Sequence, residues 1–236
     1  MSDARDRIMD RLQRARAGRG ADDAAAHAAV DGRLAARTRG PIPARAQLDP
    51  AAQVDLFVAM AEEQAATVTR VAGSDDVPAA VAAYLKAHNL PPRLRIAPDA
   101  AIEALPWAAQ PLLSVAAGRA EADDEVSLTG AFAGIAETGT LMLHSGPAGP
   151  TTLNFLPETH MVVLRADQVV GAYEDAWDRT RAAARAAGRE GVLPRTVNFI
   201  TGPSRTADIE QTIQLGAHGP RRLHIVLVED GAGDGS

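Results

Sequence analysis

The fold is decided by the stretch Thr196-Val197-Asn198-Phe199-Ile200-Thr201-Gly202-Pro203-Ser204-Arg205-Thr206-Ala207-Asp208-Ile209-Glu210-Gln211. Its β-branched and apolar residues at 196–200 predict a short buried strand. Gly202-Pro203 then predicts a turn, after which Ser204 or Thr206 can cap a helix over 207–215. Strands that lead through tight loops into helices are typical of α/β proteins.

The same stretch predicts an anion-binding site. Free backbone N–H groups and the positive end of the helix dipole would point into the loop, and Arg205 adds a guanidinium suited to carboxylate or phosphate. The residues of this candidate site are Gly202, Ser204, Arg205, Thr206 and Asp208. The alternative is an ordinary capped helix whose own Asp208 and Glu210 satisfy the dipole.

Short apolar strands alternate with helices along the rest of the chain. Further helices are expected over 51–71, 77–88 and 173–187, and further strands over 93–97, 111–116, 126–131, 140–144, 160–165 and 223–229. This alternation predicts an α/β fold with an open, mainly parallel sheet that helices cover on both faces. The segment 126–144 instead suggests an antiparallel, hairpin-like insertion.

Residues 1–47 form a predicted N-terminal basic arm and linker. Residues 1–45 carry ten arginines and six aspartates, a charge of +4, which leaves −10 for the rest of a chain whose net charge is −6. Ile8 and Leu12 lie on a predicted helix. The arm could bind a partner subunit or a second copy of the chain. The alternative is a loosely held tail. The α/β domain is expected over 48–230, with a disordered tail over 231–236.

Composition limits the classes of function. The net negative charge argues against a nucleic-acid partner. The absence of cysteine means that no thiolate can hold an iron–sulfur cluster, and none of the six histidines has a metal-site spacing, so no metal is expected. No apolar run is long enough for a membrane span and no secretory signal is evident, which makes a cytoplasmic protein the default expectation.

A second candidate site surrounds Glu137 in the segment Ala133-Gly134-Ile135-Ala136-Glu137-Thr138-Gly139-Thr140. Small apolar neighbours predict a partly desolvated carboxylate, which suits a general base or a nucleophile. Gly139 would let a substrate approach the backbone, and Thr138 and Thr140 would line a cleft shared with the 201–206 loop. The alternative is that Glu137 pairs with an arginine or accepts backbone N–H bonds.

Two histidines are candidates for acid–base work near neutral pH, namely His160 at a strand start and His218 in a Gly-bounded turn. A lone histidine at a strand edge is more often structural. The predicted helix over 207–215 would place His218 about 13 Å from the anion site. Both could then touch one small ligand only if the chain doubled back.

Three separated segments together resemble one known family. They are the stretch from Asn198 that continues to Leu215-Gly216-Ala217-His218-Gly219-Pro220, the upstream Ile135-Ala136-Glu137-Thr138-Gly139-Thr140, and Leu156-Pro157-Glu158-Thr159-His160. In this order they resemble the lactate-utilisation protein C family, whose members carry the LUD domain. The resemblance covers roughly residues 48 to 230.

The resemblance implies a NagB/RpiA/CoA-transferase-like fold and a subunit of a system that oxidises L-lactate to pyruvate. It also implies iron–sulfur partner proteins, which would hold the clusters because this chain lacks cysteine. Two alternatives stay open: a stand-alone enzyme acting on a CoA ester, a sugar phosphate or a folate-like anion, and a non-catalytic assembly subunit. CoA transferases use a glutamate in a Glu-x-Gly loop, but for Glu137 this is fold-level analogy.

Overall fold

The computed structural model describes residues 2–17, 23–189, 191–206, 214–216 and 218–229. It divides into two units, Met1–Pro41 and Ile42–Ser236. The first unit contains two helices, α1 (Ser2–Ala17) and α2 (Asp23–Ala36), of which only the first was expected. Their apolar side chains are largely exposed, including Ile8 at 61% and Leu34 at 66%.

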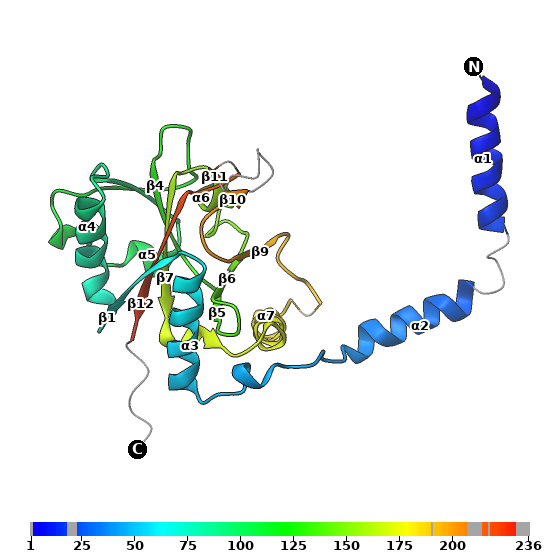
Figure 1. Cartoon of the computed structure of the whole chain (residues 1–236), viewed down its shortest axis with the longest axis horizontal. Coiled ribbons are helices and arrows are strands. Elements are labelled where there is room, and N and C mark those ends of the chain that lie inside the picture. The colour runs from blue at the N-terminus through cyan, green and yellow to red at the C-terminus, as the bar shows by residue number, and fades with distance from the viewer. Residues whose placement is uncertain (1, 18–22, 190, 207–213, 217, 230–236) are drawn as a thin grey trace. The chain divides into compact units, whose positions relative to one another are not determined.

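The second unit is built on a six-stranded sheet in which every pairing is parallel (Figure 1). Its strands, in spatial order, are β1 (Thr67–Val71), β12 (Arg222–Val228), β7 (Thr159–Arg165), β4 (Val126–Gly130), β2 (Arg93–Ile96) and β3 (Ser114–Ala117). The predicted open parallel sheet is therefore confirmed. Strand β12, the second in this order, is buried at six of its seven positions, as expected for a strand covered on both faces.

A smaller sheet follows the order β8 (Val169–Val170), β5 (Ala133–Ile135), β6 (Thr140–His144) and β9 (Val197–Ile200). Strand β6 pairs antiparallel with both β5 and β9. The hairpin predicted within 126–144 is thus β5–β6, whereas β4 belongs to the main sheet.

Five α-helices lie in the described part of the second unit: α3 (Pro50–Glu63), α4 (Val77–Ala87), α5 (Ala100–Glu103), α6 (Thr152–Phe155) and α7 (Tyr173–Ala186). The prediction of one helix over 51–71 is wrong beyond Glu63. Ala65 has a φ of 65°, which ends the helix, and the β-branched residues of 67–71 then form β1. None of the helices described is long and apolar enough to cross a membrane.

The helix predicted over 207–215 is wrong at its described end. Residues 207–213, including Asp208, lie outside the described residues. Gln214 and Leu215 form β11 (Gln214–Leu215), which pairs antiparallel with β10 (Arg205–Thr206). Ser204 precedes a strand and therefore does not cap a helix.

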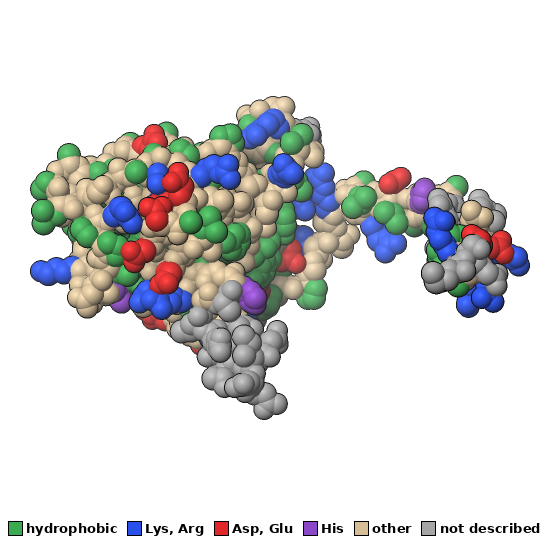
Figure 2. All heavy atoms as spheres, turned by 90° about the horizontal axis from the view of Figure 1, so that it is seen from above, with side chains coloured by type: hydrophobic (Ala, Val, Ile, Leu, Met, Phe, Trp, Pro, Cys, Tyr) green, Lys and Arg blue, Asp and Glu red, His purple; other side chains and the backbone are tan. Residues whose placement is uncertain are grey.

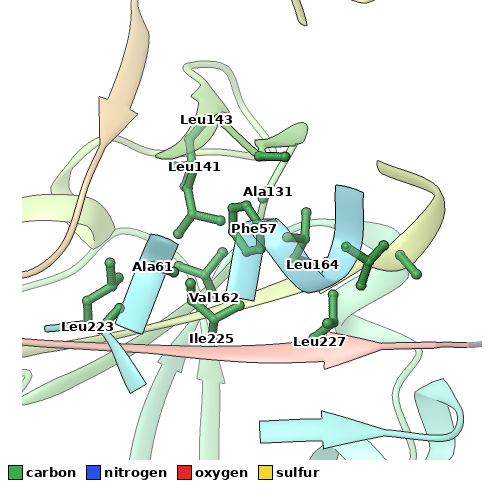
Figure 3. Close-up of a cluster of buried hydrophobic side chains, with 14 residues drawn as sticks. Phe57, Ala61, Ala131, Leu141, Leu143, Val162, Leu164, Leu223, Ile225 and Leu227 are labelled. Carbon is green, nitrogen blue, oxygen red and sulfur yellow. The ribbon is translucent and has the colours of Figure 1, made fainter. Parts of the chain in front are cut away.

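The core lies on both faces of the main sheet. On one face, Phe57 and Ala61 of α3 pack among residues of β7, β12 and β6, which also ties the smaller sheet to the larger (Figure 3). On the other face, α4 contributes Val81 and Leu85 to a second cluster. Fully burying a side chain such as Phe57 contributes about 1.5–3 kcal/mol, so helices α3 and α4 stabilise the two faces of the sheet.

Charged side chains of both signs are interspersed on the face of the second unit seen in Figure 2. Among the described residues, ion pairs include Arg95 with Asp124 at 2.9 Å and Arg221 with Glu158 at 2.7 Å. On that face the basic side chains do not gather into one patch.

Gly139, in the turn between β5 and β6, provides a direct test of how α3 is held. Its φ is +64°, and a Cβ there would lie 2.3 Å from the backbone nitrogen of Ala61. Gly188 has nearly the same φ, +67°, but a Cβ would meet no atom within 4 Å. We expect Gly188→Ala to lower the free energy of unfolding by about 1 kcal/mol and Gly139→Ala by about 3 kcal/mol or more, measured by urea denaturation. Equal losses would show that α3 yields to the added methyl group.

Candidate functional site

The carboxylate of Glu137 lies at the start of α7. Its Oε1 accepts the backbone N–H of Tyr173 at 3.1 Å, and the residue is only 7% exposed. Tyr173 is the first residue of α7, so the negative charge faces the positive end of the helix dipole. No described arginine pairs with Glu137. The carboxylate of Glu137 therefore accepts a backbone N–H bond, as one of the structural alternatives predicted.

Four hydroxyl groups gather beside Glu137. The Oγ1 of the fully buried Thr140 lies 2.7 Å from that of Thr138, 2.7 Å from that of Thr201 and 3.0 Å from the hydroxyl of Tyr173. The antiparallel pairing of β6 with β9 sets Leu141 opposite Ile200, which brings the adjacent Thr140 and Thr201 together. The Glu137 loop and the 201–206 loop therefore meet here, although sequence reasoning singled out neither Thr201 nor Tyr173.

The two glycines of these loops pack against a helix. A Cβ on Gly139 would strike Ala61, and one on Gly202, whose φ is +70°, would lie 2.1 Å from the carbonyl oxygen of Gln64. Both glycines therefore let their loops contact the carboxyl end of α3. This corrects the expectation that Gly139 opens the backbone to a substrate.

A separate cavity of about 210 Å³ lies next to these loops. It gathers candidates that are distant in sequence, namely His160, Gly202, Ser204 and His218. The remaining wall is formed by Asn154, Phe155, Phe199, Ile200, Thr201, Pro203, Gly219, Pro220 and Leu223. We call this space the small cavity. Glu137 and residues 138–140 do not line it, and the guanidinium of Arg205 instead donates to Gln64 Oε1 at 3.1 Å.

The chain doubles back beside Ser204, which brings His218 to it. The Ser204 N–H donates to the carbonyl of Pro220 at 2.8 Å, and its Oγ accepts the His218 N–H at 3.3 Å. The N–H of Gly216 donates to the carbonyl of Ser204 at 2.9 Å. The predicted separation of His218 from this loop is therefore wrong, and the Ser204 N–H is not free to bind an anion.

His160 is the fully buried imidazole of this site. Its Nε2 lies 2.8 Å from Thr129 Oγ1, while its Nδ1 has no hydrogen-bond partner among the described residues. Burial lowers the pKa of His160 to about 3. The ring is therefore neutral at pH 7, and it can hydrogen-bond a ligand as donor or acceptor, depending on its tautomer.

Asn154, a residue that sequence reasoning did not single out, completes the polar wall. It lies on α6 and is 4% exposed, yet its side-chain amide forms no hydrogen bond with a described residue. One feature of the sequence could have pointed to Asn154. It is a lone amide between Leu153 and Phe155, shortly after the Gly-Pro-rich segment 146–150.

The chain is similar to one family over most of its length. A family model described as the LUD domain matches residues 54–228. A crystal structure of a DUF162 family protein from Deinococcus radiodurans has a TM-score of 0.57 and 27% sequence identity to this chain. That similarity covers 77% of this chain and 99% of the other.

Curated relatives match over shorter segments. An uncharacterised protein of Neisseria meningitidis is 38% identical over 104 residues, which are 44% of this chain and 42% of that protein. Proteins named lactate utilization protein C are 38% identical over 102 residues in Deinococcus radiodurans and 35% identical over 99 residues in a Geobacillus species. These two matches cover 43% and 41% of this chain and 45% and 39% of those proteins. The chain thus matches less than half of the length of these relatives.

The contact of Glu137 with Tyr173 can be tested by two substitutions. Glu137→Gln keeps an oxygen that accepts the Tyr173 N–H and removes the charge, so we expect a loss of about 1 kcal/mol in the free energy of unfolding. Glu137→Ala removes the acceptor as well, and we expect a loss of roughly 2–3 kcal/mol. Urea denaturation at pH 7 measures both. If the glutamine variant loses as much as the alanine variant, charge rather than the hydrogen bond holds the start of α7.

Buried histidines predict how stability depends on pH. Burial lowers the pKa of His160 to about 3 and that of His144 and His224 to about 4, whereas an unfolded histidine titrates near 6.5. Between about pH 6.5 and these values the unfolded state binds more protons, so stability falls as pH is lowered. Each histidine adds roughly 1.4 kcal/mol per pH unit to that slope. Urea denaturation between pH 7 and pH 4.5 should give a shallower slope for His160→Gln. An unchanged slope would contradict a neutral, buried His160.

Proposed function

The chain belongs to the LUD domain family, and we propose that it is a subunit of a cytoplasmic system that oxidises L-lactate to pyruvate together with iron–sulfur partner proteins. The names of the relatives in Deinococcus radiodurans and Geobacillus support a role in lactate utilisation. The small cavity is the structural feature that supports this proposal. Its wall includes His160, Ser204 and His218, which surround a space suited to a small acid.

The size and lining of the small cavity suit a three-carbon hydroxy or keto acid. Its volume of about 210 Å³ lies below the range of about 300–1,000 Å³ found for sites that enclose drug-sized ligands, so a smaller molecule suits it better. Phe155 and Phe199 provide apolar surface, and the Asn154 amide and the free Nδ1 of His160 provide hydrogen-bonding groups. A lactate or pyruvate bound there would give the Nδ1 of His160 the hydrogen-bond partner that it lacks among the described residues.

The oxidation of lactate removes two electrons and two protons, one from the hydroxyl group and one from the α-carbon. The chain contains no cysteine, so the thiolate-bound clusters that receive the electrons are assigned to partner proteins. On this proposal, the chain binds and orients the acid while the partners carry the electrons onward.

A non-catalytic assembly role is the second candidate, and the N-terminal unit favours it. Isolated helices of 16 and 14 residues are marginal in water. Yet α1 and α2 expose Ile8, Leu12 and Leu34 at 61%, 54% and 66%. A partner surface, either a lactate-system subunit or a second copy of the chain, would cover these side chains. The charge of +4 on residues 1–45 would suit an acidic partner surface.

Two buried histidines allow a matched test of the small cavity. His160 and His224 are each at most 2% exposed, each has one ring nitrogen 2.8 Å from a threonine hydroxyl, and each leaves the other nitrogen without a described partner. His224 does not line the small cavity. We expect His160→Gln to weaken pyruvate binding to the full chain by at least roughly tenfold, and His224→Gln to leave it unchanged. Isothermal titration calorimetry measures both.

Growth on L-lactate extends this test to the whole system. A strain that carries His160→Gln in place of the natural gene should grow poorly on L-lactate, whereas one that carries His224→Gln should grow normally. Both variants must show folded far-ultraviolet circular dichroism spectra. Equal pyruvate affinity in the two variants would remove the small cavity from lactate chemistry. Normal growth on L-lactate without this gene would remove the chain from the pathway.

A further inference from the structure

A larger cavity of about 530 Å³ lies at the carboxyl ends of the main-sheet strands. From β2 the chain continues outward to β3, whereas from β4 it continues in the opposite direction to β7 and β12. Neighbouring strands β2 and β4 therefore lead away to opposite sides, which opens a crevice where they end. Ala97, directly after β2, and Gly130, at the end of β4, both line the cavity.

The charged residues of the wall favour an anion. Arg165, at the end of β7, and Arg189, after α7, are its cationic residues, and Asp99 is its acidic one. The Asp99 carboxylate accepts the N–H of Ala101 at 2.8 Å and so caps α5. Arg165 also bonds Asp167 at 3.2 Å. Arg189 is therefore the cation best placed to bind a ligand.

Other parts of the wall suit a flat, largely apolar body. The rings of Phe132 and His144 stack with their centroids 3.9 Å apart, so another flat ring could extend the stack. Burial lowers the pKa of His144 to about 4, so its ring adds no positive charge at pH 7. Apolar residues of α7 and of the segment after it also line the cavity, namely Ala183, Ala184, Val192, Leu193 and Pro194.

Asn154 joins the two cavities. It lines both of them, it is 4% exposed, and its side-chain amide has no hydrogen-bond partner in the described structure. Thr129 lines the larger cavity and contacts His160 in the wall of the small one. The two cavities therefore share Asn154 as a wall residue.

We propose that the larger cavity binds a nucleotide-class anion, with its heteroaromatic body against the Phe132–His144 wall and its phosphate group at Arg189. A volume of 530 Å³ is within the range of about 300–1,000 Å³ found for sites that enclose organic ligands of this size. Since binding here requires no lactate, the proposal is independent of the function assigned above.

Calorimetric titration of the full chain with ADP, GDP, UDP and flavin mononucleotide tests the proposal, with adenosine and pyrophosphate as partial probes. We expect at least one of the four nucleotides to bind. We expect adenosine and pyrophosphate, which each contain only a part of a nucleotide, to bind at least roughly tenfold more weakly than that nucleotide. Arg189→Gln should weaken nucleotide binding by at least roughly tenfold, whereas Arg185→Gln, an exposed arginine of α7 outside the cavity wall, should change it by less than about twofold.

Two neighbouring alanines of α7 provide the matched control for space. Ala182 and Ala183 are both exposed, but only Ala183 lines the cavity. Ala183→Phe should abolish nucleotide binding and Ala182→Phe should preserve it. Failure of all four nucleotides to bind at millimolar concentration would overturn the proposal, as would equal binding by the two phenylalanine variants. The titration contains no lactate, so neither failure affects the test of the small cavity.

Discussion

Three glycines pack closely against the backbone of α3 and of the segment before it. The positions of the Glu137 loop and of the 201–206 loop depend on these contacts. Gly139 and Gly202 touch the carboxyl end of that helix, and a Cβ on Gly171 would lie 2.0 Å from the carbonyl oxygen of Ala46, just before the helix. Because Phe57 and Ala61 anchor α3 in the core cluster that both sheets share, these contacts hold the loops against a rigid core. The hydroxyl cluster of Thr140 and the wall of the small cavity are positioned as a result.

One polar atom that is buried without a described hydrogen-bond partner, the Nδ1 of His160, belongs to a residue in the wall of the small cavity. That nitrogen is expected to cost about 1–3 kcal/mol while unpaired, although nearly all buried polar groups in proteins are paired. By contrast, the carboxylate of Glu137, which was the leading catalytic candidate from sequence, accepts a backbone N–H. The arrangement therefore favours the cavity around His160, and not the Glu137 loop, as the place where a ligand adds hydrogen bonds.

The local sequence pattern was sufficient to predict most of the helices and strands, but it predicted little of the candidate site. Apolar strands such as 223–229 and the helix over 173–187 were predicted because their periodicity and end signals lie within a few residues. The boundary at Glu63 failed because one apolar pattern continues from α3 into β1. The doubling back at Ser204 is a pairing between distant residues, which no local pattern encodes. Thr201 and Asn154 acquire their positions through the smaller sheet and α6, so only tertiary structure shows them at the site.

The pair of His160 and Thr129 explains how one site could hold both members of the proposed hydroxy acid–keto acid couple. When the threonine hydroxyl donates to Nε2, the proton resides on Nδ1, which can donate to a carbonyl or a carboxylate. When Nε2 donates to the threonine oxygen, Nδ1 becomes an acceptor for the hydroxyl of lactate. Because burial keeps the ring neutral, both tautomers are accessible without a change in net charge. A protonated imidazole could only donate, and would favour the carboxylate over the hydroxyl. The low pKa of His160 therefore suits a site that must bind substrate and product in turn.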